Sequence, residues 1–293
     1  RFAEEPAAVA RELDFPVVIK PLALAGSRGV MRADDAASFA AAVERLGRLL
    51  SDPTVAADCG GTADRYLVEG YIPGDEVALE GLLVPQPDGG GLQVLALFDK
   101  PDPLQGPFFE ETIYVTPSSL PAARQEEVRR IAERAARALG LSRGPVHVEL
   151  RLNAAGAFPI DIAARTIGGH CARSLRFDVG AGGAAASLEE VVLRQATGLP
   201  LDRLEREAPA SGVMMIPTPG PGRLHAVHGL EAARSVPLVS EVTIETRPGY
   251  RFVPLPEGGA YPGFIFARGE RPAQVVAALR RSWRCLRFEL EVG

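Results

Sequence analysis

The feature that most constrains the fold is a pair of apolar strands joined by a tight turn. Residues 146–152 (VHVELRL) alternate apolar and polar side chains, and residues 158–162 (FPIDI) follow directly after a short Gly-containing turn. Alternation of this kind predicts a strand with one polar face, and the short connection predicts an antiparallel hairpin. Such a hairpin would set Glu149 and Asp161 side by side within otherwise apolar sequence.

Two adjacent carboxylates repel each other unless a cation lies between them. Oxygen ligands of this kind suit Mg²⁺ bound together with nucleotide phosphates. Arg165 follows Asp161 by four residues and could neutralise an anionic intermediate. The alternative is a surface hairpin with an Arg–Glu pair, and the apolar surroundings favour the metal site.

The rest of the chain mixes strands and helices without strict alternation, which predicts the α+β class. We expect a polar loop at 51–64, a hairpin loop at 86–91, a linker at 197–210 and a solvated loop around His225 and His228. The expected strands are 15–21, 66–72, 76–84, 92–98, 112–115, 146–152, 158–162, 212–216, 241–247, 250–253, 263–267 and 286–292, and the expected helices are 4–13, 35–50, 121–139, 187–196 and 272–282.

Composition excludes several classes of protein. Hydrophobic residues make up 46% of the chain and charged residues 24%, which is typical of a globular protein. The net charge of -5 leaves no basic excess to neutralise nucleic-acid phosphates. No apolar run reaches the roughly 18 residues of a membrane-spanning helix. Three widely spaced cysteines without a CxxC pair fit a reducing compartment, so we expect a cytoplasmic protein.

The basic residues are 30 arginines and only two lysines, Lys20 and Lys100. A lysine kept in so arginine-rich a chain points to a position that needs a compact ammonium. Lys20 ends an apolar strand, and the turn AGSRG follows at 25–29. An ammonium and free backbone N–H groups can together hold a polyphosphate. An exposed lysine beside an ordinary turn is an equally good interpretation of this feature alone.

The strand at 66–72 offers a second nucleotide-binding feature. It carries Glu69, Tyr71 and Ile72, and Glu76 follows after a Pro-Gly break. Free backbone groups of an extended strand can pair with an adenine edge, and a nearby carboxylate can accept from ribose hydroxyls. Taken alone, an edge strand with solvated acids is the favoured alternative.

In combination and in this order, these motifs resemble the ATP-grasp superfamily. The resemblance implies an α+β fold in which two lobes grip ATP, a lid at 1–75 and a core at 76–205, followed by a small α+β domain at 206–293. It also implies bound ATP and Mg²⁺, with Mn²⁺ as an alternative metal. The implied roles are phosphate binding and catalysis for Lys20, a flexible glycine loop for Gly26, Ser27 and Gly29, adenine binding for Glu69, Tyr71 and Ile72, ribose binding for Glu76, metal binding for Glu149 and Asp161, and stabilisation of an acyl phosphate for Arg165.

The chain departs from the superfamily pattern in three ways. The second metal ligand is usually Glu, and Asp161 is one methylene shorter. Ala163 stands where Asn is frequent, which leaves open whether one or two Mg²⁺ ions bind. The N-terminal domain of the superfamily has no counterpart after Arg1, so we expect the chain to be a fragment.

Two segments indicate a branch of the superfamily. The run IAARTIGGH at 162–170 is closer to L-amino-acid (dipeptide) ligases than to biotin carboxylases, and FDKP with GPFFEE at 98–111 resembles the same branch. That resemblance implies Glu110 or Glu111 as the partner of a substrate ammonium, with simple solvation of both acids as the alternative. The implied substrate-site residues are Lys100, Glu110, Glu111, Arg165, Gly168 and Gly169.

The sequence therefore predicts an ATP-dependent, ADP-forming ligase that joins a carboxylate to an amine through an acyl phosphate, with amino acids as the expected substrates. Its expected partners are small molecules, not nucleic acid or membrane, and a homodimer is left open. The alternatives are a carboxylase-type or nucleotide-pathway enzyme that activates bicarbonate or formate, and an inactive ATP-binding fragment.

Overall fold

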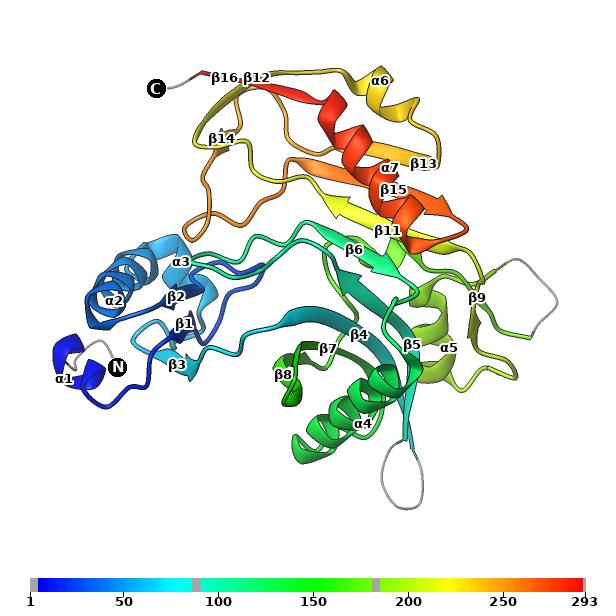
Figure 1. Ribbon diagram of the computed structural model, residues 1–293, viewed down its shortest axis with the longest axis horizontal. Coiled ribbons are helices and arrows are strands. Elements are labelled where there is room, and N and C mark those ends of the chain that lie inside the picture. Colours follow the sequence, from blue (N-terminus) through cyan, green and yellow to red (C-terminus); the bar gives the residue numbers. More distant parts are fainter. Residues whose placement is uncertain (1–4, 86–90, 181–184, 292–293) are drawn as a thin grey trace.

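The computed structural model describes residues 5–85, 91–180 and 185–291. Within these ranges the chain forms a small three-stranded sheet near the N-terminus, a long eight-stranded sheet, and a further small sheet near the C-terminus (Figure 1). Most of the predicted hairpin loop at 86–91 lies outside the described residues. Among the described residues, no helix combines the length and the apolar character needed to cross a membrane.

The N-terminal lobe is an antiparallel sheet backed by helices. Its strands are ordered β2-β1-β3. Helix α2 begins at Asp35, whose side chain accepts the Ser38 N–H at 2.8 Å, and it buries Phe39 and Leu46 against the sheet. The elements of this lobe are α1 (Pro6–Ala10), β1 (Val17–Pro21), β2 (Met31–Ala33), α2 (Ala36–Leu50), α3 (Pro53–Asp58) and β3 (Tyr66–Gly70).

The expectation of a plain polar loop at 51–64 was wrong. Asp52 caps a short helix there by accepting the Thr54 N–H at 2.8 Å. Pro53 occupies the first helical position, where its missing N–H costs nothing. The capping residue and the proline are both visible in the sequence, as Asp52 followed by Pro53.

The central sheet is antiparallel throughout, with the strand order β13-β15-β11-β6-β5-β4-β7-β8. Strands β4 and β7 are neighbours although about 70 residues of chain separate their centres. The strands are β4 (Asp75–Val84), β5 (Gly91–Lys100), β6 (Ile113–Thr116), β7 (Gly144–Asn153), β8 (Gly156–Ala163), β11 (Ala210–Met215), β13 (Val239–Ile244) and β15 (Gly263–Gly269).

The two faces of the central sheet differ in what covers them. Helices α4 (Ala122–Ala138) and α7 (Pro272–Cys285) pack on one face, with Val128 and Leu279 fully buried there (Figure 1). The opposite face packs against the short 3-10 helix η1 (Cys171–Ser174) and against α5 (Leu188–Thr197). This second face also carries the polar residues of the candidate site.

A separate three-stranded sheet, ordered β14-β12-β16, lies near the C-terminus. It contains β12 (Gly222–His228), β14 (Arg251–Phe252) and β16 (Arg287–Glu291), with α6 (Leu230–Arg234) following β12. The expectation of a solvated loop around His225 and His228 was therefore wrong. Strand β12 pairs with β16 about 60 residues later, a partner that local sequence does not reveal.

The expected linker at 197–210 was also only partly right. It contains strand β10 (Glu205–Arg206), which pairs with β9 (Phe177–Asp178). Beyond it, β11, β13 and β15 join the same sheet as β4 to β8. The central sheet thus runs across the predicted boundary at 205/206, and the division into three domains stays a prediction.

Candidate active site

The register of β4 against β7 builds one polar face. Glu76 lies opposite Arg151, Glu80 lies opposite His147, and Glu149 lies between these two pairs on β7. Directly opposite residues on neighbouring antiparallel strands point to the same side of the sheet. The sequence predicted a polar face on this part of β7, and the structure extends it onto β4.

Glu149 and Asp161 are direct partners in the β7–β8 pairing, as the predicted hairpin requires. Burial and the neighbouring charge of Glu149 raise the pKa of Asp161. Asp161 accepts no hydrogen bond from any described residue. A solvent-accessible carboxylate without a donor among the described residues, beside a second carboxylate, is a donor set that fits a divalent cation.

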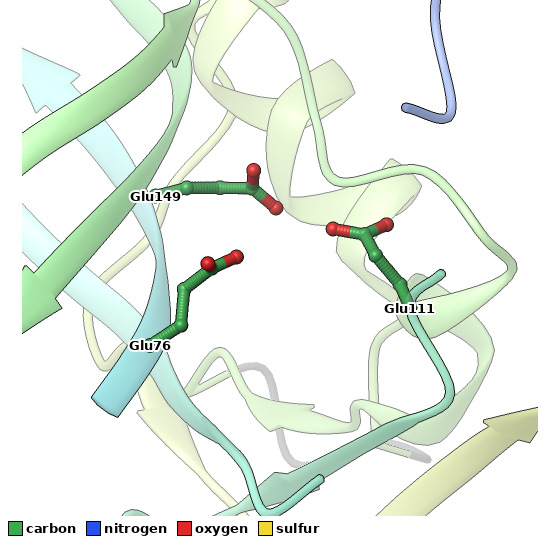
Figure 2. Close-up of side chains that lie close together, drawn as sticks. All are labelled: Glu76, Glu111 and Glu149. Atoms are coloured by element: carbon green, nitrogen blue, oxygen red, sulfur yellow. The ribbon is translucent and has the colours of Figure 1, made fainter. Parts of the chain in front are cut away.

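Lys100 is buried at the centre of an acidic cluster. Its Nζ contacts Glu76, and it lies 2.6 Å from Glu111 Oε1 and 2.9 Å from Glu149 Oε1. Figure 2 shows the three carboxylates pointing toward one another, and they offer oxygens within 4.8 Å of each other. The lysine side chain is 2% exposed. Burial opposes its charge, but the surrounding carboxylates raise the pKa of Lys100 well above its usual value.

Tyr114 on β6 completes this cluster. Its hydroxyl is 2.8 Å from Glu111 Oε1 and 3.1 Å from Glu149 Oε1. Burial and the charge of Glu149 raise the pKa of Glu111 to about 7. Burial alone would also raise the pKa of Glu149, but Lys100 and His147 hold that pKa well below its usual value. Glu111 and Glu149 are neighbours, yet they differ in their affinity for a proton.

Sequence reasoning missed His147 and Glu80. His147 Nε2 lies 3.7 Å from Glu149 Oε1, and its Nδ1 lies 3.5 Å from Glu80 Oε2. Burial would lower the pKa of His147, yet contact with both acids raises it to about 9. Glu80 accepts the Ile167 N–H at 3.0 Å and so positions the loop that follows Arg165. The alternation in VHVELRL was a signal for His147.

Glu76, the predicted ribose-binding acid, is buried. One of its oxygens contacts Lys100, and the other lies 2.8 Å from Arg151 Nε. Arg151 also donates to the Leu104 carbonyl, which ties the cluster to the loop after β5. Both oxygens of Glu76 are therefore paired with cations of the chain, and its ribose role stays a prediction.

The lid lysine reaches the core sheet. Lys20 Nζ lies 2.7 Å from Glu69 Oε2 on β3, and it donates to the Ile160 carbonyl at 3.4 Å. Ile160 precedes Asp161, and the charge of Lys20 lowers the pKa of Asp161, opposing the effect of burial. The structure therefore brings Lys20 and Asp161 together from two lobes.

The glycine loop has the expected backbone character. Gly26, Ser27 and Gly29 adopt left-handed conformations with φ of 64°, 58° and 78°. A Cβ on Gly29 would lie 3.0 Å from Leu46 Cδ1, so glycine is required there. The Gly29 N–H donates to the Pro256 carbonyl at 2.8 Å, which places the loop against the C-terminal segment.

The predicted hinge residues follow the last lid strand. Ile72 is partly buried just after β3. The Tyr71 ring lies under the Arg32 guanidinium, 4.1 Å from it, and the Tyr71 N–H donates to the Pro16 carbonyl at 2.9 Å. The adenine-binding role of these residues remains a prediction.

The substrate-site predictions separate into two groups. Glu111 joins the Lys100 cluster, whereas Glu110 accepts the Thr218 N–H at 2.9 Å and anchors a loop. Arg165 is exposed, and its Nη1 donates to the Thr166 carbonyl at 2.8 Å. Its charge lowers the pKa of Asp161, together with Lys20 and His147 and against the effect of burial.

The two glycines after Arg165 lie beside this group. Gly169 has a φ of 59°, and a Cβ on it would lie 2.6 Å from Met215 Sδ. A Cβ on the neighbouring Gly168 would be 4.0 Å from Arg165 Nη1. The close approach of Met215 explains a glycine at 169, while substrate contact by either glycine stays a prediction.

Two known protein families match parts of the chain. The family described as ATP-grasp domain matches residues 13–174, and the L-amino acid ligase C-terminal domain 2 matches residues 214–291. The L-amino acid ligase from Bacillus licheniformis superposes with a TM-score of 0.75 at 27% identity, over 96% of this chain and 66% of that one.

Two curated relatives match shorter stretches. Carnosine synthase 1 of Gallus gallus is 33% identical over 152 residues, which cover 52% of this chain and 16% of the relative. The alanine–anticapsin ligase of Bacillus subtilis is 28% identical over 162 residues, which cover 51% of this chain and 32% of the relative. The chain spans about half or less of the length of the curated relatives it matches.

The paired carboxylates, the lysine from the lid and the family match agree with one another. The chain belongs to the ATP-grasp family, and its C-terminal part is of the kind found in L-amino acid ligases.

Proposed function

We propose that the protein is an ADP-forming ligase that joins the carboxylate of one small molecule to the amine of another, with amino acids as substrates. The observation that carries the proposal is the pairing of Glu149 with Asp161 next to the lid lysine Lys20. The likeness to an L-amino acid ligase and to an alanine–anticapsin ligase supports the amino-acid substrate class.

Each part of the candidate site has a task in this proposal. Lys20 and the loop at 26–29 hold the triphosphate of ATP by charge and by backbone N–H groups. Glu149 and Asp161 hold Mg²⁺, which when bound neutralises phosphate charge and makes the γ-phosphorus a better electrophile. Carboxylate oxygens suit Mg²⁺, and the related proteins give no support for Mn²⁺ in its place.

The reaction would proceed in two steps. A substrate carboxylate oxygen attacks the γ-phosphorus of ATP, the bond to the bridging oxygen breaks, and ADP leaves. The amine nitrogen then attacks the acyl carbon, phosphate leaves, and the nitrogen loses its proton to form the amide. Negative charge develops on the acyl oxygen and phosphate, where the exposed guanidinium of Arg165 supplies a bidentate donor.

Glu111 is the better of the two predicted acids for a substrate ammonium. It belongs to the cluster around Lys100, whereas Glu110 is engaged by the backbone of Thr218. An acyl phosphate hydrolyses when water reaches it, so closure of the lid over this region protects the intermediate. The homodimer and the cytoplasmic location stay predictions.

The test is ADP release by the full-length protein with single amino acids, with amino-acid pairs, and with bicarbonate. We expect release that requires a pair, and its abolition in Lys20→Ala. Arg48→Ala, an exposed change on α2, is the control and retains activity. Full activity of Lys20→Ala would contradict the assignment of the protein as an ATP-dependent ligase. Release with bicarbonate alone favours a carboxylase, and ATP binding without turnover favours an inactive nucleotide-binding protein.

A further inference from the structure

A single acidic residue near the C-terminus binds the lid. Glu257 lies in the loop between β14 and β15, and its carboxylate pairs with Arg45 of α2, 212 positions away. The pair has two parallel bonds, from Arg45 Nε to Oε1 at 2.5 Å and from Nη2 to Oε2 at 2.8 Å. This fork-on-fork geometry fixes direction as well as distance.

The backbone beside Glu257 binds the glycine loop itself. The Gly29 N–H donates to the Pro256 carbonyl at 2.8 Å, and Arg28 Nε donates to the Glu257 carbonyl at 2.7 Å. A Cβ on Gly26 would lie 3.7 Å from the Gly259 carbonyl oxygen, so the two glycine-containing turns lie close together. One backbone N–H of the proposed phosphate-binding loop is therefore occupied by the C-terminal loop.

Arg45 also contacts the loop between β5 and β6. Its guanidinium lies 5.0 Å from the centre of the Phe108 ring, in the loop that leads to Glu111. Strand β2 is tied to the same loop, because the Arg32 N–H donates to the Pro107 carbonyl at 2.9 Å. The predicted lid, the loop between β14 and β15 and the loop between β5 and β6 thus meet around the Arg45–Glu257 pair.

The Arg45–Glu257 ion pair is accessible to solvent and can therefore break. The side chains of Arg45 and Glu257 are 38% and 37% exposed, and with Arg28 they line part of a cavity of about 920 Å³. Ion pairs that exposed contribute little to the stability of the fold. What the pair does fix is the position of α2 relative to the C-terminal segment, while the glycine loop is held there by the Pro256 and Glu257 carbonyls.

We propose that Glu257 is a positioning residue that latches the glycine loop against the C-terminal segment, and that nucleotide enters and leaves when this latch opens. The inference rests on the proposed function, in which the loop at 26–29 holds the triphosphate. Replacing the carboxylate would release α2 from the C-terminal segment and leave the glycine loop held by its backbone contacts alone. This would speed exchange of ADP without touching Lys20, Glu149 or Asp161.

The experiment compares the full-length wild type with Glu257→Gln, which keeps the side-chain shape and the backbone contacts. Two quantities are measured: backbone hydrogen exchange of residues 25–30 without nucleotide, and dissociation of a fluorescent ADP analogue by stopped flow. We expect exchange and dissociation to accelerate by about two- to fivefold, the range that an exposed ion pair supports. The charge-swapped double variant Arg45→Glu with Glu257→Arg should restore both rates toward wild type.

The matched control is Glu44→Gln, which removes an ion pair with Arg48 on the same helix α2 and which forms no hydrogen bond or ion pair with the described residues of the C-terminal loop. It should leave both rates unchanged. Equal hydrogen exchange and equal ADP dissociation in wild type and Glu257→Gln would overturn the latch. If the wild type binds no ADP, the proposed function fails, and hydrogen exchange alone decides the latch.

Discussion

The ammonium of Lys100 lies 2.9 Å from Glu149 Oε1, although 49 residues separate them in the chain. Glu149, one of the two proposed metal ligands, is therefore already paired with a cation of the protein. The same ammonium contacts Glu76 and Glu111, so a single lysine keeps one buried and two partly buried carboxylates together. Asp161 is the member of the metal pair that stays without a hydrogen-bond donor among the described residues.

Replacing Lys100 should destabilise the protein severely. Lys100→Ala leaves buried carboxylates without their shared cation, which we expect to lower the free energy of unfolding by about 3 to 5 kcal/mol. Urea unfolding measures the loss. Lys20→Ala is the matched control, because Lys20 is the only other lysine and is partly exposed, so about 1 kcal/mol or less is expected. Equal losses in the two variants would contradict a central role for Lys100.

Asp161 should control the response to Mg²⁺. Asp161→Asn removes a charged oxygen ligand, so the apparent affinity for Mg²⁺ should fall by at least about tenfold, the lower end of what outer-sphere changes cost. Titration of ADP release with Mg²⁺ measures this, and isothermal calorimetry measures it without turnover. Asp178→Asn, a change on the short strand β9, should leave the titration unchanged. An unaltered Mg²⁺ response in Asp161→Asn would remove Asp161 from the metal site.

Arg165 should act on turnover and not on folding. Its side chain is exposed and, within the part of the chain that the structure describes, bonds only to the neighbouring Thr166 carbonyl, so Arg165→Lys should leave the melting temperature unchanged. Loss of the guanidinium fork should lower kcat by about 10²- to 10³-fold, the cost of losing one donor to a developing oxyanion. Arg173→Lys, in the following segment, is the control. A change confined to KM would mean that Arg165 binds the ground state only.

His147 should make stability depend on pH. Its pKa is about 9 in the folded protein against an ordinary value of 6.5, so the protonated ring favours the folded state. That contribution, on the order of 3 kcal/mol, is fully present below pH 6.5 and is lost as the pH rises through 9. The gap in melting temperature between wild type and His147→Gln should therefore narrow between pH 6 and pH 10.

An exposed histidine provides the comparison for this pH series. His228 on β12 pairs with Glu289 at 2.8 Å, at the surface. The gap between wild type and His228→Gln should stay small across the same range. A His147→Gln gap that does not change with pH would show that the buried ring carries no charge.

Local patterns predicted the parts of the site that lie close together in the chain. The hairpin that pairs Glu149 with Asp161 follows from alternation and a short turn, and β7 and β8 form it in that register. The capped helix α2 follows from Asp35 and the apolar periodicity after it. These features are set by neighbours within about twenty residues.

The rest depends on pairings between distant segments. Nothing local indicates that β4 lies beside β7, so the sequence could not place Glu80 against His147 or Glu76 against Arg151. The same limit applies to β12, whose partner β16 is the last strand of the chain. Lys100 was singled out by composition, but its three carboxylate partners come from three different strands or loops.

The continuous central sheet has a consequence for building hybrid enzymes. Strand β11 pairs with β6 on one side and β15 on the other, so the C-terminal part is hydrogen-bonded into the same sheet as the candidate site. A graft that exchanges residues 206–293 for those of a relative must reproduce the β6–β11 register, or it leaves β6 as a bare edge open to aggregation. Hybrids designed to exchange substrate specificity should therefore be joined within surface loops of one lobe, and they should keep the β6–β11 pairing intact.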